Sequence, residues 1–182
     1  MKIRTTRFGT LEQEEEKIIN MPFGMLGFQD RRQFVILQHR EHSPFFWYQS
    51  VEDPALAFVL TSPFLFISDY KVDVDAVLKE MSWEEDGEES TLELYVVVNI
   101  PEGIPEKMTG NFIGPVLFNR KERQAVQMVI PNSPYSHKHP LIEKTRLPGE
   151  FPGLDPLVPG ELGSLEDDLP DDVVKNRYIF LY

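Results

Sequence analysis

Two kinds of residue in this 182-residue chain could carry chemistry: four histidines and pairs of adjacent carboxylates. His137 and His139 flank Lys138, and an extended backbone would place both imidazoles on one side, as half of a zinc site. The nearest carboxylate, Glu143, is not at a characteristic ligand spacing, and a surface loop before Pro140 explains the pattern more simply. A small-molecule- or metal-binding barrel that uses the turn at His137 and His139 is therefore kept as the alternative function.

The sequence contains two candidate groups of catalytic residues, and neither is convincing. His42 and Ser43 are adjacent, but no glycine elbow surrounds Ser43, and Pro44 follows where a nucleophile elbow would run into a helix. The carboxylates Glu52 and Asp53 are better explained by a turn than by acid–base work. Since no arrangement combines a nucleophile, a base and an orienting group, we predict a non-enzyme that binds no cofactor.

The elements that position these residues centre on residues 41–67, which contain seven aromatic residues and three prolines. Proline lacks an N–H donor and forces its predecessor into extended geometry, so Pro44, Pro54 and Pro63 predict bends at strand ends. The segments between them, 45–51 and 55–60, have the length and the aromatic and β-branched content of strands.

The rest of the chain follows the same pattern. A tight turn at Gly9 and Thr10 should join two short strands, and a loop over 20–28, with two glycines and one proline, should be pinned into the core. The apolar run 33–38 predicts a strand covered on both faces, and 76–81 predicts about two turns of helix. Further strands are predicted over residues 2–8, 11–17, 91–100 and 125–130. Eight to ten short strands predict a mostly β fold, an antiparallel barrel or sandwich with one or two short helices.

Charge and composition limit the partners. The formal net charge is −12, which disfavours direct nucleic-acid binding and suits a basic protein partner or simple solubility. Acidic loops at residues 12–16 and 84–89 could attract such a partner. There is no apolar run long enough to span a membrane and no secretory signal, so we expect a cytoplasmic protein without membrane contact.

Composition changes after Leu141, which predicts a domain over 1–142 and an irregular, acidic, Pro/Gly-rich arm over 143–182. Residues 143–182 contain nine acidic and four basic residues, and the last ten are apolar enough to favour docking on the domain or on a partner. An autoinhibitory flap, a further contact for a partner and a mimic of a partner remain three open roles for this arm.

Several motifs, in the same order and without large gaps over residues 1–142, resemble the FliW family of flagellar assembly factors. The most specific is Gln49-Ser50-Val51-Glu52-Asp53-Pro54. The others are Met1-Lys2-Ile3, Phe8-Gly9, the loop from Met21 to Phe28, Ser43-Pro44-Phe45, Ala57-Phe58, Met108-Thr109, Asn111, Gly114-Pro115, Tyr135 and His139-Pro140-Leu141.

The resemblance implies a small β-barrel-like fold without catalysis. It further implies two partners: the carbon storage regulator CsrA, an RNA-binding repressor of flagellin translation, and flagellin itself. Binding of CsrA would relieve that repression. For the contact surface we predict the segment Met108, Thr109, Asn111, Phe112, Ile113 and Pro115, together with Glu84, Glu85 and Glu88 of the neighbouring acidic loop. A purely structural adaptor whose arm is the functional element is a third hypothesis.

Overall fold

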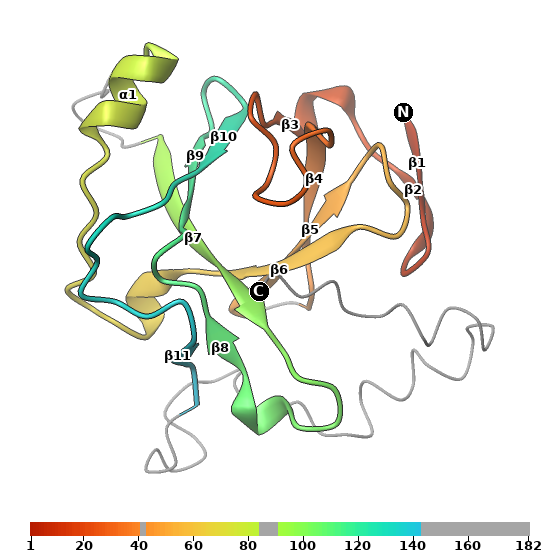
Figure 1. Cartoon of the computed structure of the whole chain (residues 1–182). Helices are drawn as coiled ribbons and strands as arrows, with labels where there is room; N and C mark the ends of the chain where they lie inside the picture. The colour runs from red at the N-terminus through yellow and green to blue at the C-terminus, as the bar shows by residue number, and fades with distance from the viewer. Residues whose placement is uncertain (41–42, 84–90, 143–182) are drawn as a thin grey trace.

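The computed structural model describes residues 1–40, 43–83 and 91–142 (Figure 1). Its strands are β1 (Lys2–Thr5), β2 (Gly9–Glu12), β3 (Ile18–Asn20), β4 (Gln33–Gln38), β5 (Phe45–Ser50), β6 (Ala57–Thr61), β7 (Leu92–Asn99), β8 (Thr109–Gly110), β9 (Val116–Asn119), β10 (Gln124–Gln127) and β11 (His139–Pro140). The helices are α1 (Asp75–Met81) and the 3-10 turns η1 (Glu15–Lys17), η2 (Pro63–Leu65) and η3 (Pro105–Lys107).

Seven strands close into a barrel, in the order β7-β6-β5-β4-β3-β10-β9, because β9 pairs back with β7. The long strand β7 serves both the ring and an extension: its first half pairs with β9, and Val98 and Asn99 pair with β8. The two-residue strand β11 then pairs with β8. The predicted mostly β, barrel-like fold is confirmed.

The prolines bound the central strands as predicted. Pro44 precedes β5, Pro54 lies in the turn before β6, and Pro63 opens η2 after β6. Strand β4 has the predicted bounds, and α1 begins one residue before the predicted helix. Ser82, in the left-handed conformation at φ 56°, ends α1 and donates its N–H to Leu78 O and Lys79 O.

The barrel interior is filled by large apolar side chains. The rings of Phe34 and Tyr48 stack at 4.5 Å, and Tyr48 meets Phe118 edge to face at 5.4 Å. Phe34 points into this core, whereas its neighbour Val35 is buried on the opposite face, under Ile3 of the β1–β2 hairpin. The prediction that this strand is covered on both faces is thus confirmed, and burying each such side chain contributes about 1.5–3 kcal/mol.

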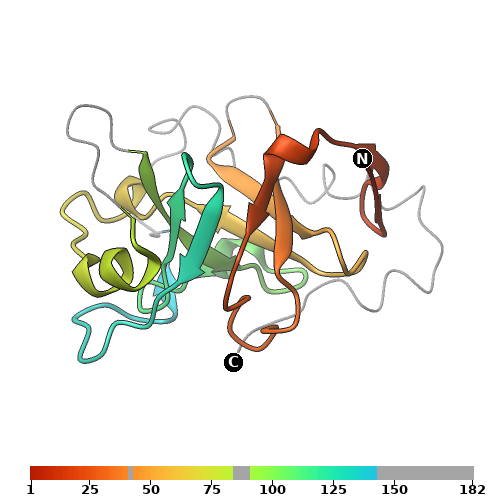
Figure 2. The same ribbon diagram turned by 90° about the horizontal axis from the view of Figure 1, so that it is seen from above.

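Two outer elements cover the ring from opposite sides, with α1 at one end of the view in Figures 1 and 2 and the β1–β2 hairpin at the other. Trp83, just after α1, packs with Leu117 and Val126, whose side chains point away from the barrel interior. These layers explain why neighbouring residues of one strand are both apolar and both buried.

Several sequence predictions are corrected. The first hairpin turns at residues 6–8, and Gly9 already begins β2. The strand expected over 11–17 ends at Glu12 and gives way to η1. The strand expected over 125–130 ends at Gln127, because the opposing Pro115 has no N–H to continue the ladder. The ring is not wholly antiparallel either, since β3 and β10 pair in parallel at the single position Asn20.

Candidate partner-binding surface

The predicted contact segment, residues 108–115, lies largely inside the molecule. Met108 is 2% exposed and Phe112 is fully buried, in a cluster with Tyr70 and Leu141. Pro115 is buried as well. These three side chains therefore support the fold, and a partner would not reach them in this conformation.

The remaining residues of the segment, Thr109, Asn111 and Ile113, are half-buried. Asn111 holds the loop in shape, because its Oδ1 accepts hydrogen bonds from the N–H groups of Ile113 (3.2 Å) and Gly114 (3.0 Å). A Cβ on Gly114 would lie 2.8 Å from Asn111 Nδ2. Contact of these residues with a partner stays a prediction, as does that of Glu84, Glu85 and Glu88, which lie outside the described residues.

His137 and His139, the residues of the alternative metal-binding function, lie in different environments. His139 belongs to β11, and its ring lies 4.7 Å from that of Phe112, while His137 is exposed. Within residues 1–40, 43–83 and 91–142, no group of three or more histidine and carboxylate side chains could hold a metal ion. The described structure therefore gives the metal-binding alternative no support.

The motif Gln49–Pro54 forms a closed bracket between β5 and β6. The buried Gln49 donates its Nε2 hydrogens to the carbonyl groups of Ser50 (2.9 Å), Asp53 (3.2 Å) and Leu56 (3.0 Å). Ser50 Oγ in turn accepts from the N–H groups of Glu52 and Asp53. Most polar groups of this turn are thus paired with one another, although the buried Gln49 Oε1 has no hydrogen-bond partner among the described residues.

The bracket also fastens two other elements to the barrel. Thr6, from the turn of the β1–β2 hairpin, donates its N–H to Pro54 O at 3.0 Å. The Glu52 carboxylate accepts the N–H groups of Arg32 and Gln33 at the start of β4. The most family-specific motif in the sequence is therefore a structural device.

A second loop, residues 21–28, caps the barrel between β3 and β4. Met21 and Met25 are fully buried in the barrel core. Gly24 has φ +65°, and a Cβ there would lie 2.6 Å from Gln29 Cα, so only glycine fits. Two anchors and one obligatory glycine give the loop a fixed backbone.

The same loop turns two apolar side chains outward. Phe23 is 49% exposed and Leu26 is 40% exposed, although the sequence predicted burial for the whole loop. Leu26 donates its N–H to Gln127 Oε1 (2.9 Å), which ties the loop to the end of β10, where Val129 is 62% exposed. We call Phe23, Leu26 and Val129 the cap surface.

Sequence reasoning missed the cap surface because composition does not separate its members from their buried neighbours. Phe23 and Leu26 stand among equally apolar residues. The only sequence signal for which side chains of the loop point inward is the spacing of four residues between Met21 and Met25. Val129 was placed inside a strand that ends at Gln127.

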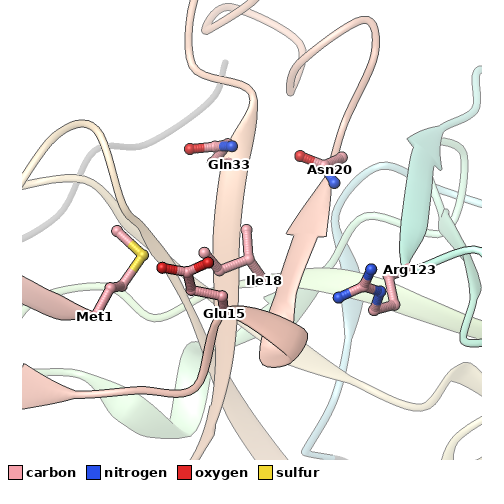
Figure 3. Close-up of a pocket in the computed structure, with 6 residues that line it drawn as sticks. All are labelled: Met1, Glu15, Ile18, Asn20, Gln33 and Arg123. Atoms are coloured by element: carbon pink, nitrogen blue, oxygen red, sulfur yellow. The ribbon is translucent and has the colours of Figure 1, made fainter.

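An open pocket of about 390 Å³ lies at the junction of β3 with β10, lined by Met1, Glu15, Ile18, Asn20, Gln33 and Arg123. Figure 3 shows the amides of Asn20 and Gln33 on one side and the guanidinium of Arg123 beside Ile18. One carboxylate, one guanidinium and two amides can hydrogen-bond to a peptide.

An aromatic and basic cluster lies where the β1–β2 hairpin meets β5. The Arg7 guanidinium stacks 4.5 Å above the Trp47 ring, and Phe8 meets the same ring edge to face. Trp47 Nε1–H donates to His39 Nδ1 at 3.1 Å, which fixes the imidazole tautomer. Burial first, and the charge of Arg40 second, lower the pKa of His39 from its ordinary value of 6.5.

No helix in residues 1–40, 43–83 and 91–142 is long and apolar enough to cross a membrane.

Comparison with known proteins identifies the fold and the family together. The family model described as FliW protein matches residues 2–141. A crystal structure of the flagellar assembly factor FliW superposes with a TM-score of 0.70 at 33% identity, covering 80% of this chain and 100% of the other.

Curated relatives give the same result. The flagellar assembly factor FliW of Alkaliphilus metalliredigens is 38% identical over 146 residues, which are 79% of this chain and 88% of the relative. That of Magnetococcus marinus is 41% identical over 145 residues (78% and 85%), and that of Geobacter sulfurreducens is 41% identical over 153 residues (82% and 94%). The chain is therefore a member of the FliW family of flagellar assembly factors.

Proposed function

We propose that the protein binds CsrA and antagonises its RNA binding, which relieves translational repression of flagellin, and that it also binds flagellin as a chaperone-like partner. Membership of the FliW family of flagellar assembly factors supports this proposal, because control of flagellin synthesis is part of flagellar assembly. The absence of catalysis and a cytoplasmic location belong to the same proposal, since a translational regulator acts where messenger RNA is translated.

The observation that carries a binding role is the cap surface. A rigid loop that exposes Phe23 and Leu26, together with the exposed Val129 after β10, is a preorganised contact site, because little conformational entropy is lost when a partner covers it. Aromatic residues such as Phe23 are enriched at the buried centre of protein interfaces. The net charge of −12 adds long-range attraction for a basic, RNA-binding partner and repulsion from the RNA itself.

A gel-shift titration tests the proposal directly. Purified CsrA is first bound to flagellin leader RNA, and the full-length protein is then added in increasing amounts. We expect the CsrA–RNA band to disappear in proportion to the protein added, with no band for the protein and RNA alone. An unchanged CsrA–RNA band at a large molar excess would contradict the proposal.

Flagellin provides the second arm of the experiment. Adding purified flagellin to the CsrA complex tests whether the two partners compete, and release of CsrA with recovery of the CsrA–RNA band is the expected result. Simultaneous binding of both proteins, seen as a ternary complex by size-exclusion chromatography, would show separate surfaces.

The acidic loop has its own test. Charge reversal of Glu84, Glu85 and Glu88 to lysine should slow association with CsrA and flatten its dependence on salt, because steering by charge acts mainly on the association rate. Stopped-flow kinetics that match the parent protein at every salt concentration would exclude a steering role for this loop.

A further inference from the structure

The chain at Val129 forms an open strand edge beside the cap surface. The N–H groups of Met128 and Ile130 donate to Pro115 O (2.8 Å) and Ile113 O (2.9 Å), so the backbone groups of Val129 point to the other side. Strand β3 pairs with β10 at a single position and has left this side before Val129. Among the described residues, none forms a backbone hydrogen bond with Val129. An added strand can therefore pair here.

The exposed apolar pair Phe64 and Leu65 lacks such an edge. Phe64 and Leu65 are exposed to a similar degree, at 48% and 38%, but they lie on η2. There, the N–H groups of Leu65, Phe66 and Ile67 already donate to Ser62 O or Pro63 O within the turn. The cap surface thus combines apolar side chains with free backbone groups, and η2 offers side chains alone.

We propose that the C-terminal segment 173–182 of the same chain adds a short strand at Val129 and covers the cap surface. Seven of its ten residues are β-branched, aromatic or leucine, which are the residues that favour strands or apolar burial: Val173, Val174, Tyr178, Ile179, Phe180, Leu181 and Tyr182. From Tyr178 onward both faces of a strand would be apolar, so either register presents an apolar face to the cap surface.

Charge favours the same pairing. The segment carries Lys175 and Arg177 and no acidic residue, whereas residues 1–142 carry 21 acidic and 14 basic residues, a net charge of −7. The rest of the arm, 143–172, contains nine acidic and two basic residues, so its net charge has the same sign as that of residues 1–142. Only the last ten residues therefore combine apolar character with the opposite charge.

Residues 143–172 are numerous enough to connect Ile142 with a segment docked at Val129. Thirty residues separate Ile142 from Val173, and a flexible chain of that length spans roughly 30 Å, comparable to the width of a small domain. A tether of this kind gives an effective concentration of about 1 mM, so even weak pairing would be substantially occupied. The two-residue pairing of β11 with β8 shows that this protein already uses strands of such length.

The proposal goes beyond binding of CsrA or flagellin and holds whether or not they bind. The test uses the full chain, whose lack of cysteine lets a single Asn176→Cys substitution carry one nitroxide label. We expect at least 5-fold stronger paramagnetic broadening of the Gly24, Leu26 and Val129 amides than of the Phe64 and Leu65 amides. Leu26→Glu should abolish the difference, and the matched surface variant Phe64→Glu should leave it.

Hydrogen exchange tests the strand itself. The Val129 amide should exchange at least 10-fold more slowly in the parent chain than in the Ile179→Asp variant, with the Trp83 indole as a reference that does not change. Broadening centred on η2, or equal exchange of Val129 in both proteins, would overturn the proposal. Broadening seen only between a labelled chain and a second, isotope-enriched chain would overturn it too, because a second copy would then be the occupant.

Discussion

The two loops that hold this barrel together are built in opposite ways. The bracket, residues 49–54, turns Gln49 and Ser50 inward and pairs both side chains with its own backbone. The cap loop, residues 21–28, fixes its backbone with buried methionines and turns apolar side chains outward. Both are rigid, yet only the cap loop leaves groups that another polypeptide could use. A motif that identifies a family is therefore not by itself a motif that binds the family's partners.

Gly24 fixes the backbone of the cap loop, and its substitution should have the largest effect on stability. Gly24→Ala should lower the free energy of unfolding by about 3 kcal/mol, because the new Cβ meets backbone and the residue is held at positive φ. Gly9→Ala is a matched control: its φ of +67° is nearly the same, but no atom lies within 4 Å of the Cβ position. Gly9→Ala should lower the free energy of unfolding by about 1 kcal/mol. Equal decreases for the two variants in urea denaturation would refute a packing role for Gly24.

The bracket is tested by removing its central amide. Gln49→Leu keeps the side-chain size but leaves buried carbonyl groups without their donor, so the free energy of unfolding should fall by about 2 kcal/mol. Gln38→Leu, at the exposed end of β4, should change it by less than about 0.5 kcal/mol. Similar values for both variants would mean that the bracket contributes little to stability.

Substitutions in the cap surface should change binding strongly and stability little, in contrast to those in the bracket. Phe23→Ser combined with Leu26→Ser should alter the free energy of unfolding by less than about 1 kcal/mol, since both side chains are largely exposed. Affinity for CsrA should nevertheless fall about 10-fold by calorimetry. Phe64→Ser, which removes an equally exposed aromatic ring elsewhere, should bind as the parent does, and the same loss in that control would remove the cap surface from the interface.

The smallest effect concerns pH. Protonation of His39 removes the acceptor for Trp47 Nε1–H. Because the folded-state pKa is lowered, the unfolded chain binds the proton first, and stability falls as pH drops from about 6.5 through the lowered pKa. Of the two tryptophan indole signals, that of Trp47 should move in this window and that of Trp83 should not. His39→Gln should remove the transition, and movement of both signals would point to global unfolding instead.

Local patterns in the sequence predict the local structure well. Pro44, Pro54 and Pro63 mark real strand ends, and the run Phe34–Leu37 is buried on two faces because each face meets a different cluster. The number of short, proline-bounded strands also predicts the mostly β fold that the structure shows.

Contacts between distant residues decide the rest. Phe112 is buried because Tyr70 lies 5.5 Å away and donates its hydroxyl to Phe112 O, a partner 42 positions earlier in the chain. Phe23 is exposed because Met21 and Met25 occupy the core position that it could have filled. Composition alone does not separate these outcomes, so the structure buries Phe112 of the predicted contact segment and exposes Phe23 of the cap loop.

The parallel pairing of Asn20 with Gln124 has a consequence for how this molecule comes apart. The barrel closes between β3 and β10 through one residue pair and the hydrogen bond from Asn20 N–H to Arg123 O (2.9 Å). This is the shortest pairing between neighbouring strands of the ring. Transient splitting at that joint would convert the cylinder into a curled sheet while the remaining ladders stay intact. Among the described residues, this joint is therefore the place where opening of the barrel breaks few backbone hydrogen bonds.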